Sequence, residues 1–262
     1  MLTAPKIKAM KGSSKITMLT AYEYLTASYL EKAGVDIILV GDSLGMVFQG
    51  EKETLPVTVD EIIYHAKAVR RGAPATMVAV DMPFMSYQAS VEQAMGNGGK
   101  IIKQSRANCL KLEGGVEICP QIRALVKAGI PVVGHIGLQP QSVNFYGGYP
   151  VQGVLAADAQ RLINDARELE KAGVFAIVVE KVKASTTKKI TAAVNVPVIG
   201  IGAGPHCDGQ VLVTHDMLGA FVDFKPSFVK LYEKQAMRSI GAIKRFSADV
   251  KRSAFPSKKY YY

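Results

Sequence analysis

Four acidic residues stand at the ends of short apolar runs that are rich in β-branched residues. These residues are Asp42, Asp81, Glu113 and Glu180. The carboxyl ends of parallel strands meet on one side of an α/β fold, and active sites are built there. We therefore expect the four carboxylates, although distant in the sequence, to share one site.

A single acidic residue after a strand serves about as often only to cap the next helix. Four of them at four strand ends favour a shared site, and such carboxylates repel one another unless positive charge lies among them. Lys111, inside the run 109–112, supplies one positive charge, and a divalent cation would supply more. Oxygen ligands without sulfur favour Mg²⁺ or Mn²⁺.

One hard cation takes fewer than four carboxylates from a protein, so one remains free to abstract a proton beside a metal-bound carbonyl. The cation then stabilises the enolate as a Lewis acid. The residue types alone do not show which carboxylate is the base. His135 lies within the apolar run 131–137 and is expected to be a polar contact or a core residue rather than a metal ligand.

Short apolar runs recur along the chain and alternate with helical stretches. The strands are predicted at 16–20, 36–40, 76–80, 109–112, 131–137, 175–179 and 197–202, with a weaker eighth near Leu218–Val222. Each run is apolar throughout, as expected for strands that are covered on both faces.

Helices are predicted between these strands, at 22–33, 59–70, 90–104, 116–127, 156–172 and 185–193. Thr58 and Glu61 have the spacing of a capping box. Lys-Ala-Gly occurs three times just before a strand, at 32–34, 127–129 and 171–173, which is typical of a helix that ends at a glycine.

This alternation predicts the α/β class and a single (β/α)8 TIM barrel that spans residues 1–262. An open, doubly wound sheet is the alternative, and the absence of a GxGxxG sequence after the first strand disfavours it. The longest irregular stretch, 139–155, is long enough to favour a functional loop.

The net charge of +10 is concentrated at one end of the chain. Residues 225–262 contain ten Lys or Arg and two acids, so they carry +8 of that charge. We therefore expect a solvated basic helix or tail from about residue 225, and no nucleic-acid partner. A basic, non-catalytic binding protein that uses 225–259 as its contact surface is an alternative of a different class, which salt-sensitive RNA binding would support.

No run approaches the ~18 apolar residues of a membrane span, and the amino-terminal segment lacks a secretory pattern. The three cysteines, Cys109, Cys119 and Cys207, form no CxxC pair. A reducing compartment fits best. We therefore expect a cytoplasmic protein without a membrane partner.

The chain also resembles a known family. Its motifs are ITMLTAYEY (16–24), VGDSLGMV (40–47), AVDMPFMSY (79–87), LKLEGG (110–115), VVGHIGLQPQSV (132–143) and IGIGAGPHCDGQVLVTHD (199–216). In this order and spacing they resemble the ketopantoate hydroxymethyltransferase family, over roughly residues 13 to 235.

The resemblance implies a transferase of pantothenate and coenzyme A biosynthesis. Members of the family move a hydroxymethyl group from the co-substrate 5,10-methylenetetrahydrofolate to 3-methyl-2-oxobutanoate, which gives 2-dehydropantoate. The resemblance further implies Mg²⁺ or another divalent cation and a homo-oligomer, a decamer of barrels.

The resemblance also implies roles for individual residues. It assigns the metal site to Asp42, Asp81 and Glu113. It assigns contacts with the 2-oxo acid to Asp42, Ser43, Asp81, Lys111 and His135, with Lys111 placed at the substrate carboxylate. Glu180 resembles the proton acceptor at C3 of the substrate.

A related barrel lyase that acts on another 2-oxo acid is the alternative within the same chemistry. Such lyases usually need a reactive cysteine in a mobile loop. Cys119 precedes a proline inside a predicted helix and Cys207 follows Gly-Ala-Gly. Neither cysteine is placed for that role, so the sequence favours the hydroxymethyltransferase.

Overall fold

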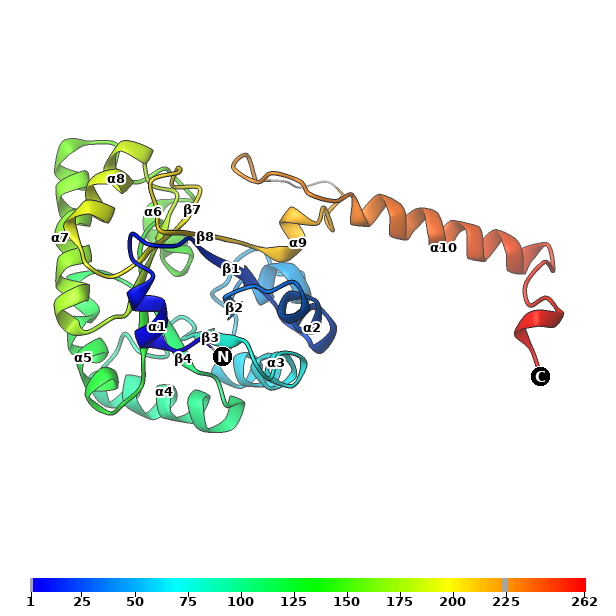
Figure 1. Ribbon diagram of the computed structural model, residues 1–262, viewed down its shortest axis with the longest axis horizontal. Helices are drawn as coiled ribbons and strands as arrows, with labels where there is room; N and C mark the ends of the chain where they lie inside the picture. Colours follow the sequence, from blue (N-terminus) through cyan, green and yellow to red (C-terminus); the bar gives the residue numbers. More distant parts are fainter. Residues whose placement is uncertain (1, 223–225) are drawn as a thin grey trace. The chain divides into compact units, whose positions relative to one another are not determined.

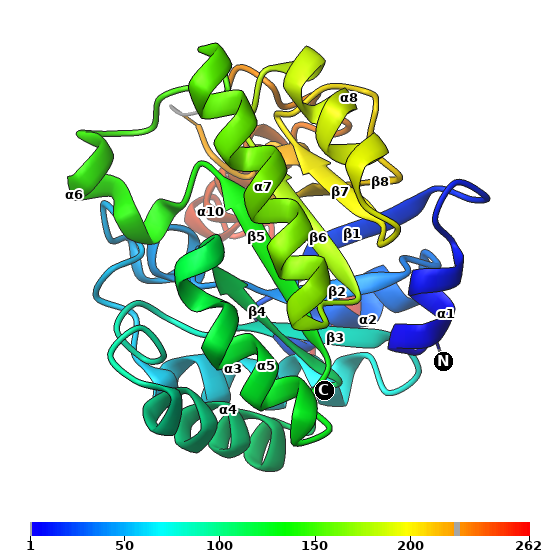
Figure 2. The same ribbon diagram turned by 90° about the vertical axis from the view of Figure 1, so that its left-hand side faces the viewer.

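The computed structural model describes residues 2–222 and 226–262. The chain divides into two compact units, Met1–Leu212 and Val213–Tyr262. The first unit contains the predicted barrel, and its strands and helices are drawn in Figures 1 and 2. The expectation of a single domain over 1–262 stays a prediction.

Eight parallel strands close into a barrel in sequence order, with β1 paired to β8. The strands are β1 (Ile16–Thr20), β2 (Ile37–Val40), β3 (Met77–Asp81), β4 (Cys109–Glu113), β5 (Val132–Gly137), β6 (Ala176–Glu180), β7 (Val198–Ile201) and β8 (Gly209–Leu212). The predicted (β/α)8 barrel is confirmed, since helices surround this closed sheet (Figure 2).

Seven of the predicted strands are confirmed, and the eighth is wrong. Residues 218–222 contain no strand, and the barrel closes instead through β8, which has the sequence Gly-Gln-Val-Leu. A strand of four residues with an exposed glutamine has no continuous apolar run, so the pattern used for the other strands does not detect it.

The helices of the first unit are α1 (Ala4–Ala9), α2 (Tyr24–Lys32), α3 (Val59–Gly72), α4 (Val91–Ser105), α5 (Cys119–Lys127), α6 (Val143–Tyr146), α7 (Ala156–Ala172) and α8 (Ala184–Ala193). All six predicted helices are confirmed, and Thr58 and Glu61 form both bonds of the capping box. The three Lys-Ala-Gly glycines have positive φ. The short α1 and α6 were not predicted.

Alternate residues of each strand face the barrel interior, because side chains of a strand alternate between its two faces. Towards the amino ends of the strands this interior is apolar, and Ile7 of α1 joins it. On β3, Met77 and Ala79 belong to this cluster, and Asp81 is the next residue of the same face. The interior therefore changes from apolar to charged at the carboxyl ends of the strands.

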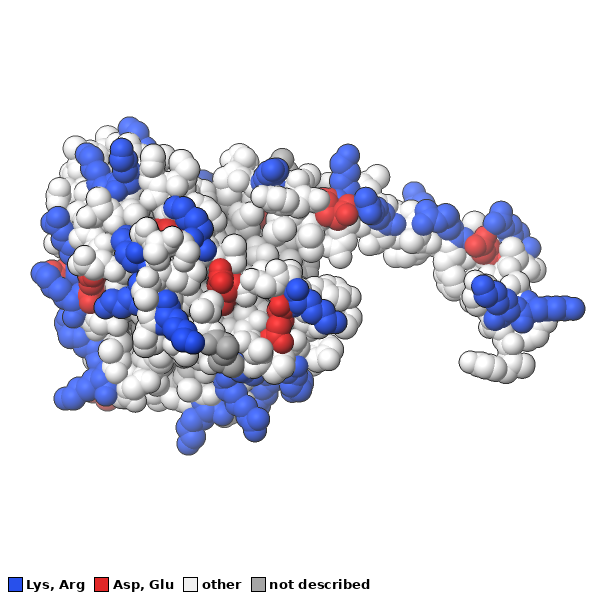
Figure 3. Space-filling view, in the orientation of Figure 1, with Lys and Arg blue, Asp and Glu red and all other residues white. Residues whose placement is uncertain are grey.

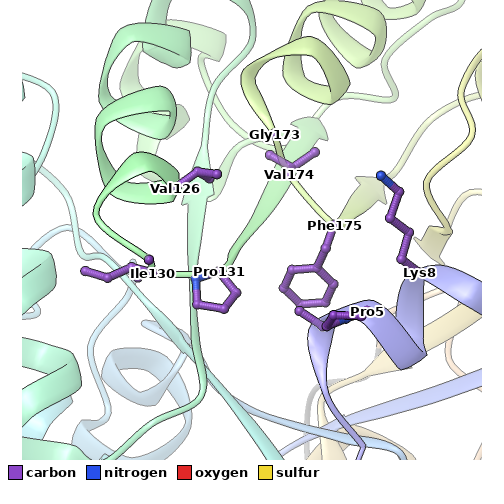
Figure 4. A pocket seen from close by; sticks show the side chains of 10 residues that line it. Pro5, Lys8, Val126, Ile130, Pro131, Gly173, Val174 and Phe175 are labelled. Carbon is purple, nitrogen blue, oxygen red and sulfur yellow. The ribbon is translucent and has the colours of Figure 1, made fainter.

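A pocket of about 350 Å³ lies at the opposite, amino end of β5 and β6 (Figure 4). Pro5 and Lys8 of α1 line it with Phe175 beside them, and Ile130 and Pro131 lie across from these residues. None of the candidate site residues lines this pocket.

The second unit contains the predicted basic helix. Its helices are α9 (Thr214–Met217) and α10 (Gln235–Lys251), and Lys and Arg side chains project along α10 (Figure 3). The predicted boundary at about Lys225 lies outside the described residues. Across both units, no described helix combines the length and apolarity that crossing a membrane requires.

Gly137, the last residue of β5, lies very close to the backbone of Glu180, and a substitution there tests this close approach. It has a φ of +96°, and a Cβ there would lie 2.4 Å from the Glu180 carbonyl oxygen. Gly129 has a similar φ of +86° but no neighbour within 4 Å, so it is the matched control. We expect Gly129→Ala to lower the free energy of unfolding by about 1 kcal/mol, and Gly137→Ala by about 2 kcal/mol more. Urea denaturation measures both, and equal losses would contradict the close approach.

Candidate active site

Five of the predicted site residues lie on four neighbouring strands, β3 to β6. They are Asp81, Lys111, Glu113, His135 and Glu180. The register places Asp81 beside Lys111, and Glu113 beside His135. The side chains share the interior face of the barrel, so the fold brings together residues that are as many as 99 positions apart in sequence.

Lys111 and Asp81 form a buried ion pair. The Lys111 Nζ lies 2.6 Å from Asp81 Oδ1, and each side chain is almost fully buried. Burial lowers the pKa of Lys111, but the surrounding carboxylates outweigh it and raise that pKa above its ordinary value. Burial raises the pKa of Asp81, and Lys111 compensates only part of that rise. Lys111 is therefore a permanent cation in this interior.

Asp42 follows β2 and faces the same charges. Its backbone N–H donates to Asp81 Oδ2 at 3.1 Å, which fixes the turn after the strand against β3. The pKa of Asp42 is held well above its usual range by burial and by the charges of Asp81 and Glu113. Asp42, Asp81 and Glu113 thus bring three buried carboxyl groups to the one ammonium of Lys111.

His135 lies between two carboxylates. Its Nδ1 is 3.3 Å from Glu113 Oε1 and its Nε2 is 3.3 Å from Glu180 Oε2. Burial and Lys111 lower the pKa of His135, but Glu113 and Glu180 outweigh them and raise it to about 9. Burial likewise raises the pKa of Glu113, which His135 and Lys111 pull below its ordinary value. His135 is thus an imidazolium near neutral pH.

Exposure separates Glu180 from the other carboxylates. Its side chain is 19% exposed, whereas those of Asp81 and Glu113 are 3% exposed. Ser43, after Asp42, is partly buried, and its hydroxyl lies 2.8 Å from the Tyr22 hydroxyl. The site therefore combines buried charged side chains, such as Asp81 and Glu113, with one carboxylate, Glu180, that an entering molecule can reach.

The structure adds Gln141 and Tyr87 to the site. The Gln141 Nε2 donates to Asp42 Oδ2 at 2.8 Å, and its backbone N–H donates to Glu113 Oε2 at 3.0 Å. The Tyr87 hydroxyl lies 3.0 Å from Gln141 Oε1. Both residues stand inside motifs that carry the family resemblance, but a buried neutral side chain in a loop has no pattern that marks its role in advance.

The donor set fits a hard divalent cation. Asp42, Asp81 and Glu113 supply only oxygen, and all three carboxyl groups are buried around the single charge of Lys111, so a further cation would be favourable there. Among the described residues, no three His, Cys, Asp or Glu side chains converge tightly enough to enclose an ion by themselves. Mg²⁺ does not require such a cage, because it is commonly held by one or two carboxylates, with water and substrate completing the shell.

The cysteines are not part of this site. Cys119 begins α5 and Cys207 precedes β8, and both thiols are buried. Burial raises the pKa of each, that of Cys207 to about 11. A thiol in that state is a poor nucleophile near neutral pH.

Sequence comparison finds close relatives. A family model described as ketopantoate hydroxymethyltransferase matches residues 1–258. The 3-methyl-2-oxobutanoate hydroxymethyltransferase of Moorella thermoacetica is 50% identical over 260 residues, which cover 99% of this chain and 97% of that protein. The protein of the same name from Caldicellulosiruptor bescii is 51% identical over 255 residues, which cover 97% and 96%.

Solved structures share the barrel at much lower identity. Phosphonopyruvate hydrolase in complex with oxalate and Mg²⁺ has a TM-score of 0.61 at 15% identity, and the match covers 98% of this chain and 93% of that one. A 2,3-dimethylmalate lyase also has a TM-score of 0.61 at 15% identity, with 100% and 93% covered. At such identity the likeness shows the fold alone.

Because the pKa of His135 is raised, its ion pairs make a pH-dependent contribution to the free energy of unfolding. Because the folded pKa of about 9 exceeds the ordinary 6.5, that contribution is fully present below pH 6.5 and is lost as the pH rises through 9. We expect this contribution to the free energy of unfolding to reach about 3 kcal/mol. Urea denaturation of the native chain and of His135→Gln, with a chelator present, measures it as the part of their stability difference that changes with pH. A difference that stays constant from about pH 6 to about pH 10 would contradict the imidazolium.

Proposed function

Because the chain belongs to the ketopantoate hydroxymethyltransferase family, we propose that it transfers a hydroxymethyl group from 5,10-methylenetetrahydrofolate to 3-methyl-2-oxobutanoate. The product is 2-dehydropantoate, in pantothenate and coenzyme A biosynthesis. The observation that carries this proposal is the pairing of a buried, cationic Lys111 among carboxylates with one carboxylate, Glu180, that remains accessible.

The reaction needs two things from the site. The bond between C3 of the oxo acid and its single hydrogen must break, and the carbanion-like C3 must form a bond to the one-carbon unit. Both bonds between that unit and the two folate nitrogens break: the bond to C3 replaces one, and a bond to the oxygen of water replaces the other. The proton from C3 and one proton from water end on the two nitrogens. The site must therefore hold a dianionic species beside a proton acceptor while it excludes competing reactions.

Lys111 suits the carboxylate of the substrate. Its ammonium is buried and permanently charged, and a buried cation binds an anion more strongly than a solvated one does. Ser43, beside Asp42, offers a hydroxyl towards the same region, and Tyr22 orients that hydroxyl. We assign the substrate contacts to Asp42, Ser43 and Lys111, together with Asp81 and His135.

Asp42, Asp81 and Glu113 would hold the divalent cation, which is Mg²⁺ or a similar ion. When bound, such an ion supplies Lewis-acid polarisation of the keto group, which makes the neighbouring C3 hydrogen removable. The protein contributes the fixed carboxylates: Lys111 restrains Asp81, and His135 restrains Glu113.

Glu180 is the proposed acceptor of the C3 proton. Its side chain is more exposed than those of Asp81 and Glu113, so substrate can reach it. The His135 Nε2 lies 3.3 Å from Glu180 Oε2 and restrains that carboxylate. His135 thus orients the base and does not itself take part in the bond changes.

We also propose that the protein is a cytoplasmic homo-oligomer, a decamer as the family resemblance implies. Three large apolar residues of α10, Met237, Ile243 and Phe246, are each more than half exposed in the single chain. Apolar surface of this kind marks protein–protein contacts. We expect size-exclusion chromatography with light scattering to give a mass about ten times the 28.2 kDa of one chain. A monomeric mass would contradict the proposal.

Glu180→Gln tests the assigned base. This variant should bind 3-methyl-2-oxobutanoate by calorimetry with Mg²⁺ present, yet exchange its C3 hydrogen with deuterated water at least ~100-fold more slowly than the native chain. Glu168→Gln, on α7 and paired with Lys171, is the matched control and should exchange normally.

Each outcome of this experiment has a separate meaning. Full exchange in Glu180→Gln would remove Glu180 from the role of base. A native chain that makes no 2-dehydropantoate, or that cleaves an isocitrate-type substrate instead, would overturn the reaction itself and favour the related barrel lyase.

A further inference from the structure

Gln141 makes more polar contacts inside the site than any catalytic role assigned above explains. It lies in the 3₁₀ turn Pro140–Ser142, at the start of the loop after β5, and is 4% exposed. We propose that Gln141 is a positioning residue that fixes Asp42 and Glu113, two carboxylates of the proposed metal site, relative to each other. This inference rests on the proposed metal site and adds to it a residue that is not itself a ligand.

Gln141 contacts the carboxylates of Asp42 and Glu113 through two different groups. The side-chain amide of Gln141 donates to Asp42 Oδ2 at 2.8 Å, and its backbone N–H donates to Glu113 Oε2 at 3.0 Å. Asp42 follows β2 and Glu113 ends β4, so the strand between them does not fix their spacing directly. Gln141 joins the two across β3.

The orientation of the Gln141 amide is fixed by its other partners. The carbonyl oxygen of Met82 can only accept, and it lies 2.9 Å from Nε2. On the other side, Oε1 receives the Gln88 Nε2 donor at 3.0 Å and lies 3.0 Å from the Tyr87 hydroxyl. A flipped amide would place a donor against the Gln88 donor, and an acceptor against Met82 and Asp42, so the NH₂ group must face Asp42.

A neutral donor serves this position better than a charged one. Asp42 is repelled by Asp81 and Glu113, and it needs a donor to hold it near them. A lysine there would hold it too, but the added positive charge would cancel the negative charge that attracts a cation. The amide orients the carboxylate and leaves its charge available.

Tyr87 connects this arrangement to β4. Its buried hydroxyl accepts from the Glu113 backbone N–H at 3.1 Å and lies 2.8 Å from the Glu113 carbonyl oxygen. The strand end that carries Glu113 and the amide that holds Asp42 thus contact the same hydroxyl. Partners of this kind around ligands typically change metal affinity by about 10- to 100-fold when they are removed.

The test measures Mn²⁺ binding to the full-length protein by titration calorimetry. Gln141→Met keeps the volume and the backbone N–H but removes the amide, and we expect its Kd for Mn²⁺ to rise by about 10- to 100-fold. Gln121→Met is the matched control, since Gln121 is also buried but lies on α5, and it should leave the Kd unchanged. Added Mn²⁺ should restore much of the lost activity of Gln141→Met, which a merely damaged barrel would not show.

A second variant covers the case in which Gln141→Met does not fold. Gln88→Met removes one donor that orients the Gln141 amide and touches neither carboxylate, so the Kd should rise by about 3-fold or more. A native Kd in Gln141→Met, or in Gln88→Met if the first does not fold, would overturn the positioning role. A native chain that binds no Mn²⁺ would overturn the proposed metal site instead.

Discussion

The site depends on one buried cation. Lys111 lies inside the barrel among carboxylates, 2.6 Å from Asp81, where removing either partner would leave an uncompensated charge. Its charge holds the neighbouring acids together, and their charges in turn raise its pKa. Every other group has to be arranged around this balance: His135 joins two more carboxylates, and Gln141 restrains Asp42 without altering the total charge.

The barrel and its shared acidic site could be predicted from the sequence, because most strands are continuous apolar runs and the acids follow them directly. The family was predicted separately, from the resemblance of the motifs. Asp81, Lys111, Glu113, His135 and Glu180 came from the pattern of the strands, and the register of β3 to β6 brings them together. Their individual roles as metal ligands, substrate contacts or base remain proposals, since roles depend on a bound substrate and cation rather than on strand periodicity.

Other parts could not be predicted, for reasons that differ. β8 lacks an apolar run, so a later segment, 218–222, was wrongly preferred. α1 is too short for a helical period to be recognised, although Ile7 enters the core. Gln141 and Tyr87 are neutral, and their importance comes from tertiary hydrogen bonds between separate loops, which no local pattern in the sequence encodes.

The side-by-side placement of Asp81 with Lys111 also bears on the register in which the barrel forms. A one-residue slip of β4 would turn Lys111 and Glu113 outward, among the apolar side chains beneath the helices, and would bring Leu110 and Leu112 inward. Such a barrel would bury unpaired charge and open readily. The buried charges at the carboxyl ends of the strands therefore favour the native register of β4 over the neighbouring registers during folding.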